Sequence, residues 1–203
     1  MDDSDLLSIL ACGDPLLRGR ARALTIDEIR STATQRLIER MRVTMYAAPG
    51  VGLAAPQIGE ALQLAVLEDG PRQWGHLSES ERKVRERDIL PFTVLVNPSY
   101  EALADDGSVS FYEGCLSVPG LTGVVSRHHS IRVAALDERG EPVNRVFSGW
   151  SARIVQHELD HLAGTLYLDR IESRSLSTVE NFANFWAGRP LGAVARELGF
   201  ADR

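Results

Sequence analysis

The sequence of 203 residues has little cysteine, almost no lysine and no long apolar run. Its two cysteines, Cys12 and Cys115, cannot form a disulfide framework, which is typical of a protein from a reducing compartment. No apolar run approaches the ~20 residues that cross a bilayer. The acidic start MDDSDLLSIL resembles neither a secretory signal nor an Arg-rich transit peptide. We therefore expect a cytoplasmic protein without membrane association, in which Cys12 is a core thiol.

Positive charge is also scarce. Lysine and arginine total 22 against 28 aspartate and glutamate residues, a formal net charge of -6, and Lys83 is the single lysine. A surface with this balance does not attract a polyanion, so we expect no direct nucleic-acid binding. The composition, 44% hydrophobic and 25% charged, excludes a disordered or fibrous chain. Because no linker or repeat divides the chain, we predict a single domain over residues 1–203.

Hydrophobic periodicity predicts helices together with short strands. Thr25 and Glu28 are spaced as a capping box, which predicts a helix that ends before Pro49. Strand patterns lie at 62–67 and 92–96, and a hairpin pattern lies at 131–136 and 143–147. The segment 69–88 is expected as a loop with one or two helical turns, residues 149–163 as a second long helix, and residues 176–200 as broken helix. These elements predict an α+β fold with short mixed or antiparallel sheets around a central helix.

The clearest chemical signal lies in that second helix. His157, Glu158 and His161 fit the pattern H-E-x-x-H. Residues i and i+4 share one helix face about 6 Å apart along the axis, so the two imidazoles can bind one metal ion. Glu158 on the next face can then reach a water molecule beside the metal. We predict a metal-binding helix, and two hydrogen-bonded core histidines are the structural alternative.

A catalytic metal needs a third protein ligand and an open position. Glu180 follows His161 by 19 residues, about where thermolysin-like zinc peptidases carry their third ligand. Cys115 precedes His157 by 42 residues and lies in a glycine-containing, non-helical segment, where the backbone can approach a site closely. The residues alone leave both ligands open.

Three segments together resemble the peptide deformylase family, which carries G-φ-G-L-A-A-x-Q, E-G-C-L-S and Q-H-E-x-D-H in this order. They stand here, all complete, as Gly50–Gln57, Glu113–Ser117 and Gln156–His161. The resemblance extends from about residue 8 to about residue 173 and leaves 174–203 as a C-terminal extension. Pro119–Gly120 and Gly149–Trp150 look most like the branch that includes organellar enzymes of plants and animals.

The resemblance implies a metal-dependent hydrolase that removes the formyl group from N-terminal formyl-methionine and releases formate. One divalent metal ion would be bound by Cys115, His157 and His161. Fe(II) is the metal that the family implies in the cell, while Zn(II), Ni(II) and Co(II) suit the same donors. Arg127 is expected to pair with Glu113 and to hold the Cys115 segment from behind.

The resemblance also assigns roles in the reaction. A metal-bound water would attack the formyl carbon, with Glu158 as general base and then general acid. The side-chain amide of Gln57 and the backbone N–H of Leu116 would stabilise the oxyanion. An HExxH zinc endopeptidase with Glu180 as third ligand is one alternative, and a non-catalytic member that binds ribosomes or nascent chains is another.

The expected partners are N-formyl-methionyl peptides, met as nascent chains at the ribosome. Trp150 and Ile154 share the helix face of the two histidines, so they are candidates for the methionine pocket, with core packing as the alternative. Glycines near a strand edge permit close approach of an extended peptide. Family positions around the peptide correspond here to Val51, Gly52, Phe111 and Gly114.

Overall fold

The computed structural model describes residues 6–48, 50–75, 77–103 and 107–201. Within them the strands are β1 (Gly52–Ala54), β2 (Leu64–Asp69), β3 (Leu90–Ala102), β4 (Ser108–Cys115), β5 (Val118–His128), β6 (Ser130–Leu136), β7 (Pro142–Ser148) and β8 (Ser177–Thr178). The α-helices are α1 (Ile26–Arg30), α2 (Thr32–Ala47), α3 (Pro71–Trp74), α4 (Glu79–Val84), α5 (Gly149–Leu162), α6 (Val179–Asn181) and α7 (Leu191–Leu198). None of these helices has the length and apolar character required to span a bilayer.

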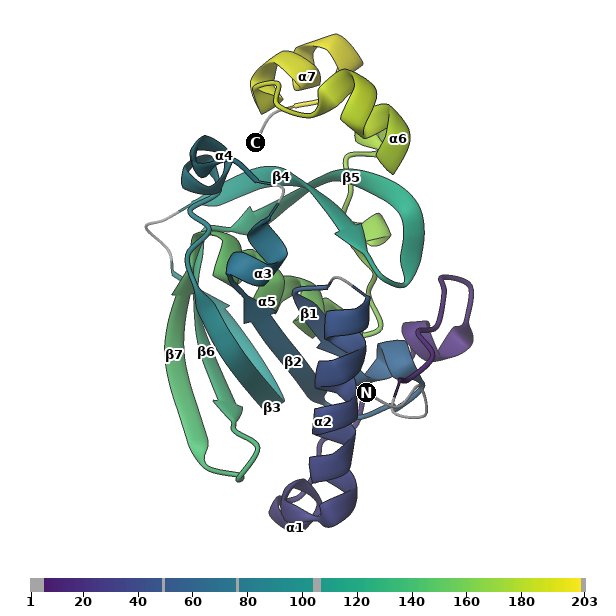
Figure 1. The fold of residues 1–203 in the computed structure, drawn as a ribbon, viewed down its shortest axis with the longest axis vertical. Helices are drawn as coiled ribbons and strands as arrows, with labels where there is room; N and C mark the ends of the chain where they lie inside the picture. Colours follow the sequence, from purple (N-terminus) through teal and green to yellow (C-terminus); the bar gives the residue numbers. More distant parts are fainter. Residues whose placement is uncertain (1–5, 49, 76, 104–106, 202–203) are drawn as a thin grey trace.

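A five-stranded sheet in the order β1-β2-β3-β6-β7 separates the two long helices. Along β2, Leu64 and Val66 pack with the apolar side of α2, while Ala65 and Leu67 pack with the apolar side of α5. Side chains alternate across a strand, so α2 and α5 cover opposite faces of the sheet (Figure 1). The continuous apolar run 64–67 is the pattern of a strand buried on both faces.

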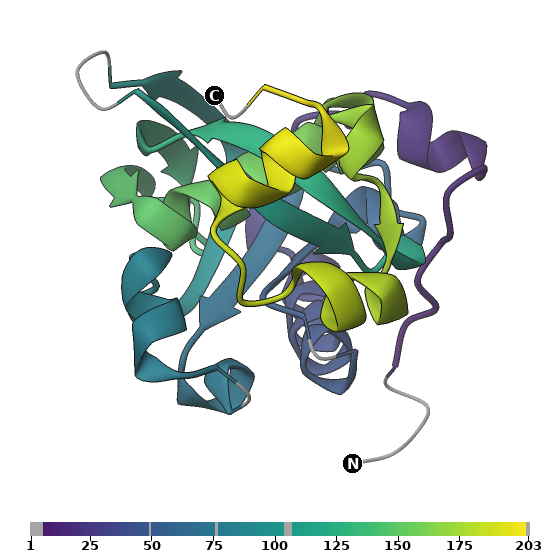
Figure 2. The same ribbon diagram turned by 90° about the horizontal axis from the view of Figure 1, so that it is seen from above.

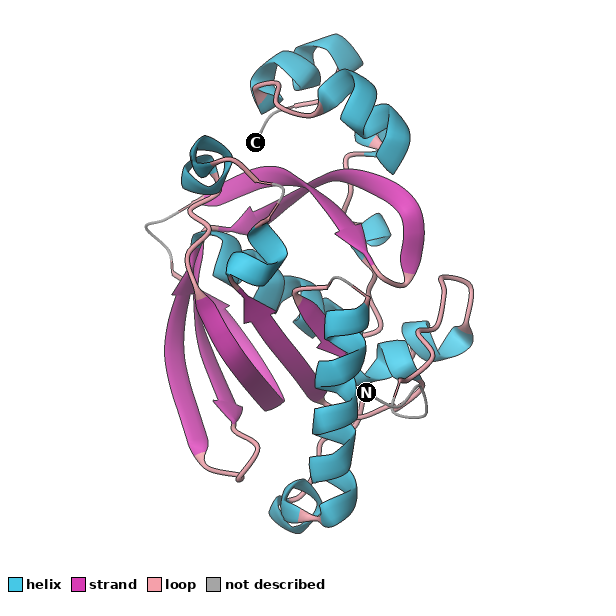
Figure 3. Ribbon diagram, in the orientation of Figure 1, coloured by secondary structure: helices cyan, strands magenta, loops and turns pink. Residues whose placement is uncertain are grey.

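A second sheet arches over the end of α5. It has the order β4-β5-β8, and its long hairpin pairs Tyr112 with Val124 and Glu113 with Gly123. Figure 3 shows this arch above the five-stranded sheet, with the C-terminal helices on its outer side. The predicted α+β class is confirmed, and every strand pair among the described residues is antiparallel.

The first predicted helix is interrupted. The Thr25–Glu28 capping box is present, but α1 ends at Arg30 because Ser31 is extended, with φ -65° and ψ 147°. The Ser31 hydroxyl accepts the backbone N–H of Thr34, which makes Ser31 the N-cap of α2. The predicted continuous helix is therefore wrong at this residue. Pro49, expected just beyond the helix end, lies outside the described residues.

Other sequence predictions had mixed outcomes. The hairpin of β6 and β7 and the two helical turns within 69–88 are confirmed. The tail is helical with a break between residues 186 and 191, also as predicted. Cys12 is exposed, so its prediction as a core thiol is wrong. Its backbone N–H is bound by the Ser117 carbonyl, and the adjacent Gly13, at φ +105°, turns the chain at the surface.

Candidate active site

Helix α5 is held in place at both ends by glycine. Gly149 has φ +58°, and a Cβ there would stand 2.7 Å from the Cβ of Glu86. Gly164, just beyond the helix, has φ +76° in the C-terminal cap, and a Cβ there would lie 2.5 Å from the Arg18 carbonyl oxygen. Between these ends the helix buries its apolar side against the sheet. The histidines are thus carried by a rigid central element.

Three metal-ligand side chains meet where the β4–β5 turn faces α5. The ligand atoms of Cys115, His157 and His161 all lie within 4.8 Å of one another. The Cys115 Sγ stands 3.2 Å from His161 Nε2. One thiolate and two imidazoles at this spacing suit a divalent transition metal, so the donor set fits the metal that the sequence predicted. The pairing of β4 with β5 places Cys115, at the end of β4, beside helix α5.

Burial sets the protonation of the two imidazoles differently. Burial lowers the pKa of His161, which favours the neutral form that a metal ligand needs. Burial also acts to lower the pKa of His157, but the contacts with Cys115 and Glu113 outweigh it and raise that pKa. A cation bound between these groups would compete with the proton on His157.

Glu113 orients His157 from behind. Its carboxylate Oε2 lies 3.0 Å from His157 Nδ1, which leaves Nε2 of that ring on the side of the cluster. The predicted pair with Arg127 is present, and this guanidinium donates two hydrogen bonds of 3.0 and 2.9 Å to the two carboxylate oxygens. Burial acts to raise the pKa of Glu113, but Arg127 and His157 hold that pKa well below its usual range. Glu113 is therefore an anion and can fix the imidazole.

The charged network extends further than the sequence indicated. Arg127 also bonds Asp160, and Arg170 donates two hydrogen bonds of 2.7 Å to that carboxylate. Arg153, a buried residue of α5, donates hydrogen bonds to the Glu113 carboxylate and to the Val125 carbonyl oxygen. The sequence did not predict these roles, although Arg153 and Asp160 are charged residues in the helix that carries the H-E-x-x-H motif; both are buried in the structure. Buried charges are retained where they are paired.

Glu158 projects into the site through a gap left by a glycine. A Cβ on Gly52 would stand 2.3 Å from Glu158 Oε1, so any larger residue would displace this carboxylate. Glu158 is 4% exposed, and its Oε2 is buried without a hydrogen-bond partner in the described structure. Burial raises the pKa of Glu158 to about 7, in the range where a carboxyl group can both accept and donate a proton near neutral pH.

Gln57, in the 3-10 helix Ala55–Ile58, and Leu116, in the turn between β4 and β5, lie near the same cluster. The Gln57 side-chain amide donates toward Cys115 Sγ at 3.6 Å and toward Ser117 Oγ at 3.3 Å. Its carbonyl oxygen accepts the Ala54 N–H at 2.8 Å, which fixes the amide orientation. Leu116 follows Cys115 in the two-residue turn between β4 and β5. Both predicted oxyanion donors therefore lie beside the cysteine.

An open cavity of about 560 Å³ runs beside the cluster. Its walls include most of the predicted site residues: Val51, Gly52, Gln57, Gly114, Cys115, Leu116, Trp150, Ile154, His157 and Glu158. Phe111 does not line it. Its ring packs edge-on against Trp150 at 5.8 Å between centroids and lines a neighbouring cavity of about 410 Å³. The structure thus brings the predicted residues together, with Phe111 one layer behind.

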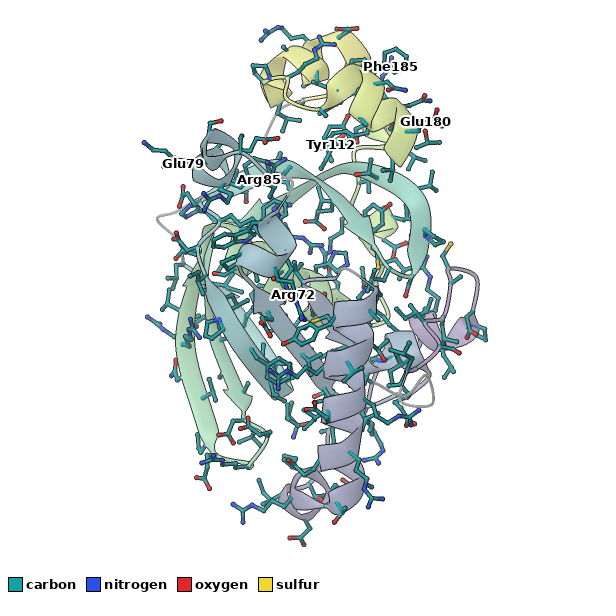
Figure 4. The ribbon with its side chains drawn as sticks, in the orientation of Figure 1. Arg72, Glu79, Arg85, Tyr112, Glu180 and Phe185 are labelled. Carbon is teal, nitrogen blue, oxygen red and sulfur yellow. The ribbon has the colours of Figure 1, made fainter. Side chains whose placement is uncertain are left out.

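The alternative third ligand lies elsewhere. Glu180 is an exposed residue of α6, and Figure 4 shows it on the outer side of the C-terminal helices. The donor cluster that the described residues form contains Cys115 in its place. The prediction of an endopeptidase that uses Glu180 as metal ligand is therefore not favoured, because the chain places α6 above β5 and away from α5.

A buried H-E-x-x-H helix, a cysteine as third donor and a free carboxylate beside an open groove define a metal-dependent hydrolase. Within this class the chain belongs to the peptide deformylase family. The family model for polypeptide deformylase matches residues 6–177. The family is metal-dependent and removes the formyl group of N-terminal formyl-methionine, which agrees with the Cys/His/His cluster.

Individual relatives agree with this membership. Peptide deformylase 1 of Streptomyces coelicolor is 50% identical over 194 residues, 96% of this chain and 86% of the relative. The mitochondrial peptide deformylase of Homo sapiens is 39% identical over 167 residues, 82% of this chain and 68% of the relative. A Met-Ala-Ser-bound class I type b peptide deformylase from Acinetobacter baumannii has a TM-score of 0.72 at 33% identity, covering 82% of this chain and 98% of that chain.

Proposed function

We propose that this chain hydrolyses the formyl group of N-formyl-methionyl peptides through the cluster of Cys115, His157 and His161, with Glu158 as the proton carrier. The observation that carries the proposal is the cluster of Cys115, His157 and His161 beside one peptide-sized cavity, whose wall includes Cys115, His157 and the unpartnered buried carboxylate of Glu158. Catalytic groups need this proximity to one reacting atom.

One divalent metal ion would be held by the Cys115 thiolate and the two imidazoles. We propose Fe(II) in the cell, with Zn(II), Ni(II) or Co(II) able to occupy the same donors. When bound, the ion supplies a positive charge that lowers the pKa of water and polarises the formyl carbonyl. Glu113 and Arg127 would keep His157 oriented for this role.

Glu158 would take a proton from the attacking water molecule and later give it to the leaving amine. Its buried carboxylate has one oxygen without a partner, so it is available for this transfer. A carboxyl group whose pKa lies near the operating pH can both accept the proton of the water and later donate it to the amine. Gly52 would keep the carboxylate in its position, because no side chain at residue 52 competes for the space.

Oxyanion stabilisation would come from Gln57 and Leu116. The Gln57 amide is held by its bond from Ala54 N–H, so its NH₂ group faces the site before substrate arrives. The backbone N–H of Leu116 would be the second donor. Donors that are oriented in advance cost no reorganisation during the reaction, and loss of one typically costs about 2.7–4 kcal/mol.

The peptide would lie between two sheet edges. In the described structure β1 is an edge of the five-stranded sheet and β4 is an edge of the three-stranded sheet, and both contribute to the cavity wall. An extended peptide can add to such edges through its backbone. Val51, Gly52 and Gly114 would offer that backbone, and Trp150 with Ile154 would contact the methionine side chain. Phe111 would support Trp150 from behind.

We propose that the protein acts in the cytoplasm on nascent chains at the ribosome, as one domain over residues 1–203 with 174–203 as an extension. The cytoplasm is a reducing compartment, and this suits Cys115, which must remain a free thiol to bind metal. The Met-Ala-Ser-bound structure of the related deformylase from Acinetobacter baumannii supports a short peptide as the recognised product.

The test is formate release from formyl-Met-Ala-Ser by protein purified without oxygen, with metal content measured on the same sample. The proposal predicts formate release in proportion to metal, up to one ion per chain, and none after treatment with a chelator. Full metal content without formate would contradict it. Cleavage of unformylated peptides by the same sample would indicate a peptidase instead.

A further inference from the structure

The C-terminal segment is anchored on the active-site hairpin before it reaches the cavity. Strand β8 pairs with β5, with Leu121 opposite Thr178 and Thr122 opposite Ser177. One step earlier, the buried Ser175 hydroxyl accepts the Val124 N–H at 2.7 Å. The position of α6, which follows β8 directly, is therefore set by the same hairpin that carries the metal-ligand cysteine.

Val179, the first residue of α6, lines the active-site cavity. Its side chain is 52% exposed, although it belongs to the rim of the groove that contains Cys115 and Glu158. The exposed side chain of Val179 is therefore accessible to a molecule bound in the groove. The neighbouring rim residue Leu121 is also apolar and only partly buried. Two apolar side chains thus line this part of the groove: Leu121 from β5 and Val179 from the C-terminal extension.

Tyr112 connects this wall to the next cavity. Its ring packs on Phe182 at 4.5 Å between centroids, so β4 and the C-terminal segment contact each other above the groove. Tyr112 lines both the active-site cavity and the neighbouring cavity of about 410 Å³, to which Phe182 and Trp186 also contribute. Figure 4 shows Tyr112 between the β4–β5 arch and the C-terminal helices. The groove therefore continues past Tyr112 along the C-terminal segment.

The direction of β4 indicates what meets this wall. The strand leads away from Cys115 through Gly114 to Tyr112, and its outer edge is free in the described sheet. A peptide with its formyl group at Cys115 and its backbone along this edge advances by roughly 3.3 Å per residue. The residues that follow the formyl-methionine would then reach the level of Tyr112 and Val179.

We propose that Val179, together with Tyr112 and Phe182, forms a contact site for the residues that follow formyl-methionine and favours apolar side chains there. This inference rests on the proposed function, whose active site it extends. The side chains of Val179, Tyr112 and Phe182 carry no charge. An acidic peptide side chain would lose its hydration against them without gaining a cationic partner among them, and would be bound less well.

The test compares kcat/KM for formyl-Met-amide, formyl-Met-Ala-Leu and formyl-Met-Ala-Asp in the metal-loaded parent and in Val179→Asp. The parent should prefer the leucine peptide over the aspartate peptide. Val179→Asp should lower kcat/KM for formyl-Met-Ala-Leu about fivefold to tenfold, the size of an apolar side-chain contact. It should lower kcat/KM for formyl-Met-amide much less than for formyl-Met-Ala-Leu, because the amide is too short to contact Val179. Val179→Ala should act in the same direction with a smaller effect.

Val146→Asp is the matched control, since Val146 is 47% exposed on β7 and lines none of these cavities. Val146→Asp should leave kcat/KM for all three substrates at the parent values. Equal ratios of kcat/KM for the long and short substrates in Val179→Asp and the parent would overturn the contact site while leaving deformylation intact. Absence of formate from every substrate with metal bound would overturn the proposed function and this inference with it.

Discussion

At the scale of single residues, the site depends on a glycine as much as on its ligands. The Glu158 side chain occupies the space that a Cβ of residue 52 would need. Gly52 therefore sets how closely the β1 edge approaches α5 and where the carboxylate stands. The family resemblance predicts Gly52 beside the substrate, whereas the structure shows its close approach to Glu158.

Gly52→Ala should displace the Glu158 carboxylate without touching the metal ligands. A misplacement of about 1 Å can cost about 100-fold in rate, so we expect kcat for formate release to fall by about that factor. Metal content should remain at the parent value. Gly75→Ala, at an exposed glycine with no atom within 4 Å of the added carbon, is the control and should be neutral. Full activity in Gly52→Ala would refute this steric role.

Arg127 is the residue on which two buried carboxylates depend. Arg127→Ala should leave Glu113 and Asp160 without their shared cation and release the orientation of His157. Partners that hold a metal ligand typically contribute 10–100-fold in metal affinity. We expect a loss of this size, measured by competition with a chelator at a fixed pH.

Arg127→Lys provides the second variant, because removing a buried charge can itself unfold a protein. Lysine keeps the charge but not the forked geometry that bonds both Glu113 oxygens. It should fold, as judged by circular dichroism, and bind metal more weakly than the parent. Unchanged metal retention in both folded variants would contradict the role of Arg127 in supporting metal binding.

The sequence analysis predicted the ligands but only part of their support. The H-E-x-x-H spacing predicts His157 and His161 as ligands, the family resemblance adds Cys115, and the Arg127–Glu113 pair was predicted. The bonds of Asp160 with Arg170 and of Arg153 with Glu113 were not, because they join strands and helix ends whose packing sequence spacing does not reveal. The register of β4 against β5 places Arg127 of β5 within hydrogen-bond reach of Glu113.

At the scale of elements, local signals predicted the starts of α1 and α5 and the strands β2, β3, β6 and β7, but not the start of α2 or the β4–β5 hairpin. The capping residues Thr25 and Glu28 behave as their spacing indicates. The long β4–β5 hairpin was not predicted, because Pro119, Gly120 and Gly123 weaken its local strand pattern. Its two strands are consecutive in the chain, and β5 also pairs with the distant strand β8, a contact that no local pattern reveals. Glycine there also allows the ligand segment to approach α5.

Glu28 makes the first helix start sensitive to acid. Its pKa in the folded chain is about 2, below the ordinary 4.5, because Arg22 and then the Thr25 N–H favour the carboxylate. The unfolded chain therefore binds the proton first as the pH falls. The stabilisation is complete above pH 4.5 and is lost between about 4.5 and 2.

Glu28→Gln should lower Tm slightly at pH 7, since this is an exposed pair. The difference in Tm between parent and variant should shrink as the pH falls below 4.5. Glu39→Gln, at an exposed glutamate 3.9 Å from Arg42, serves as a control for the loss of one surface carboxylate. A Tm difference that stays constant from pH 7 to pH 3 would exclude the proposed pH dependence.

At the scale of the whole molecule, the active site lies where two sheets and a helix meet. One sheet contributes the β1 edge, the other contributes the β4 edge with Cys115, and α5 between them contributes the histidines (Figure 1). Seen from above, the C-terminal helices lie across the β4–β5 arch (Figure 2). The sequence predicted the central helix and the residues of the site, whereas the two sheet edges and the position of the C-terminal segment at the groove follow from strand pairing that the structure reveals.

The most direct test of the account measures metal content and formate release on the same preparations of the parent, Cys115→Ser and Glu158→Gln. The account predicts one metal per chain and activity in the parent. It predicts loss of both metal and activity in Cys115→Ser, because one of three ligands is weakened. In Glu158→Gln it predicts full metal content with formate release reduced at least 100-fold. Full metal retention in Cys115→Ser, or turnover by Glu158→Gln, would contradict it.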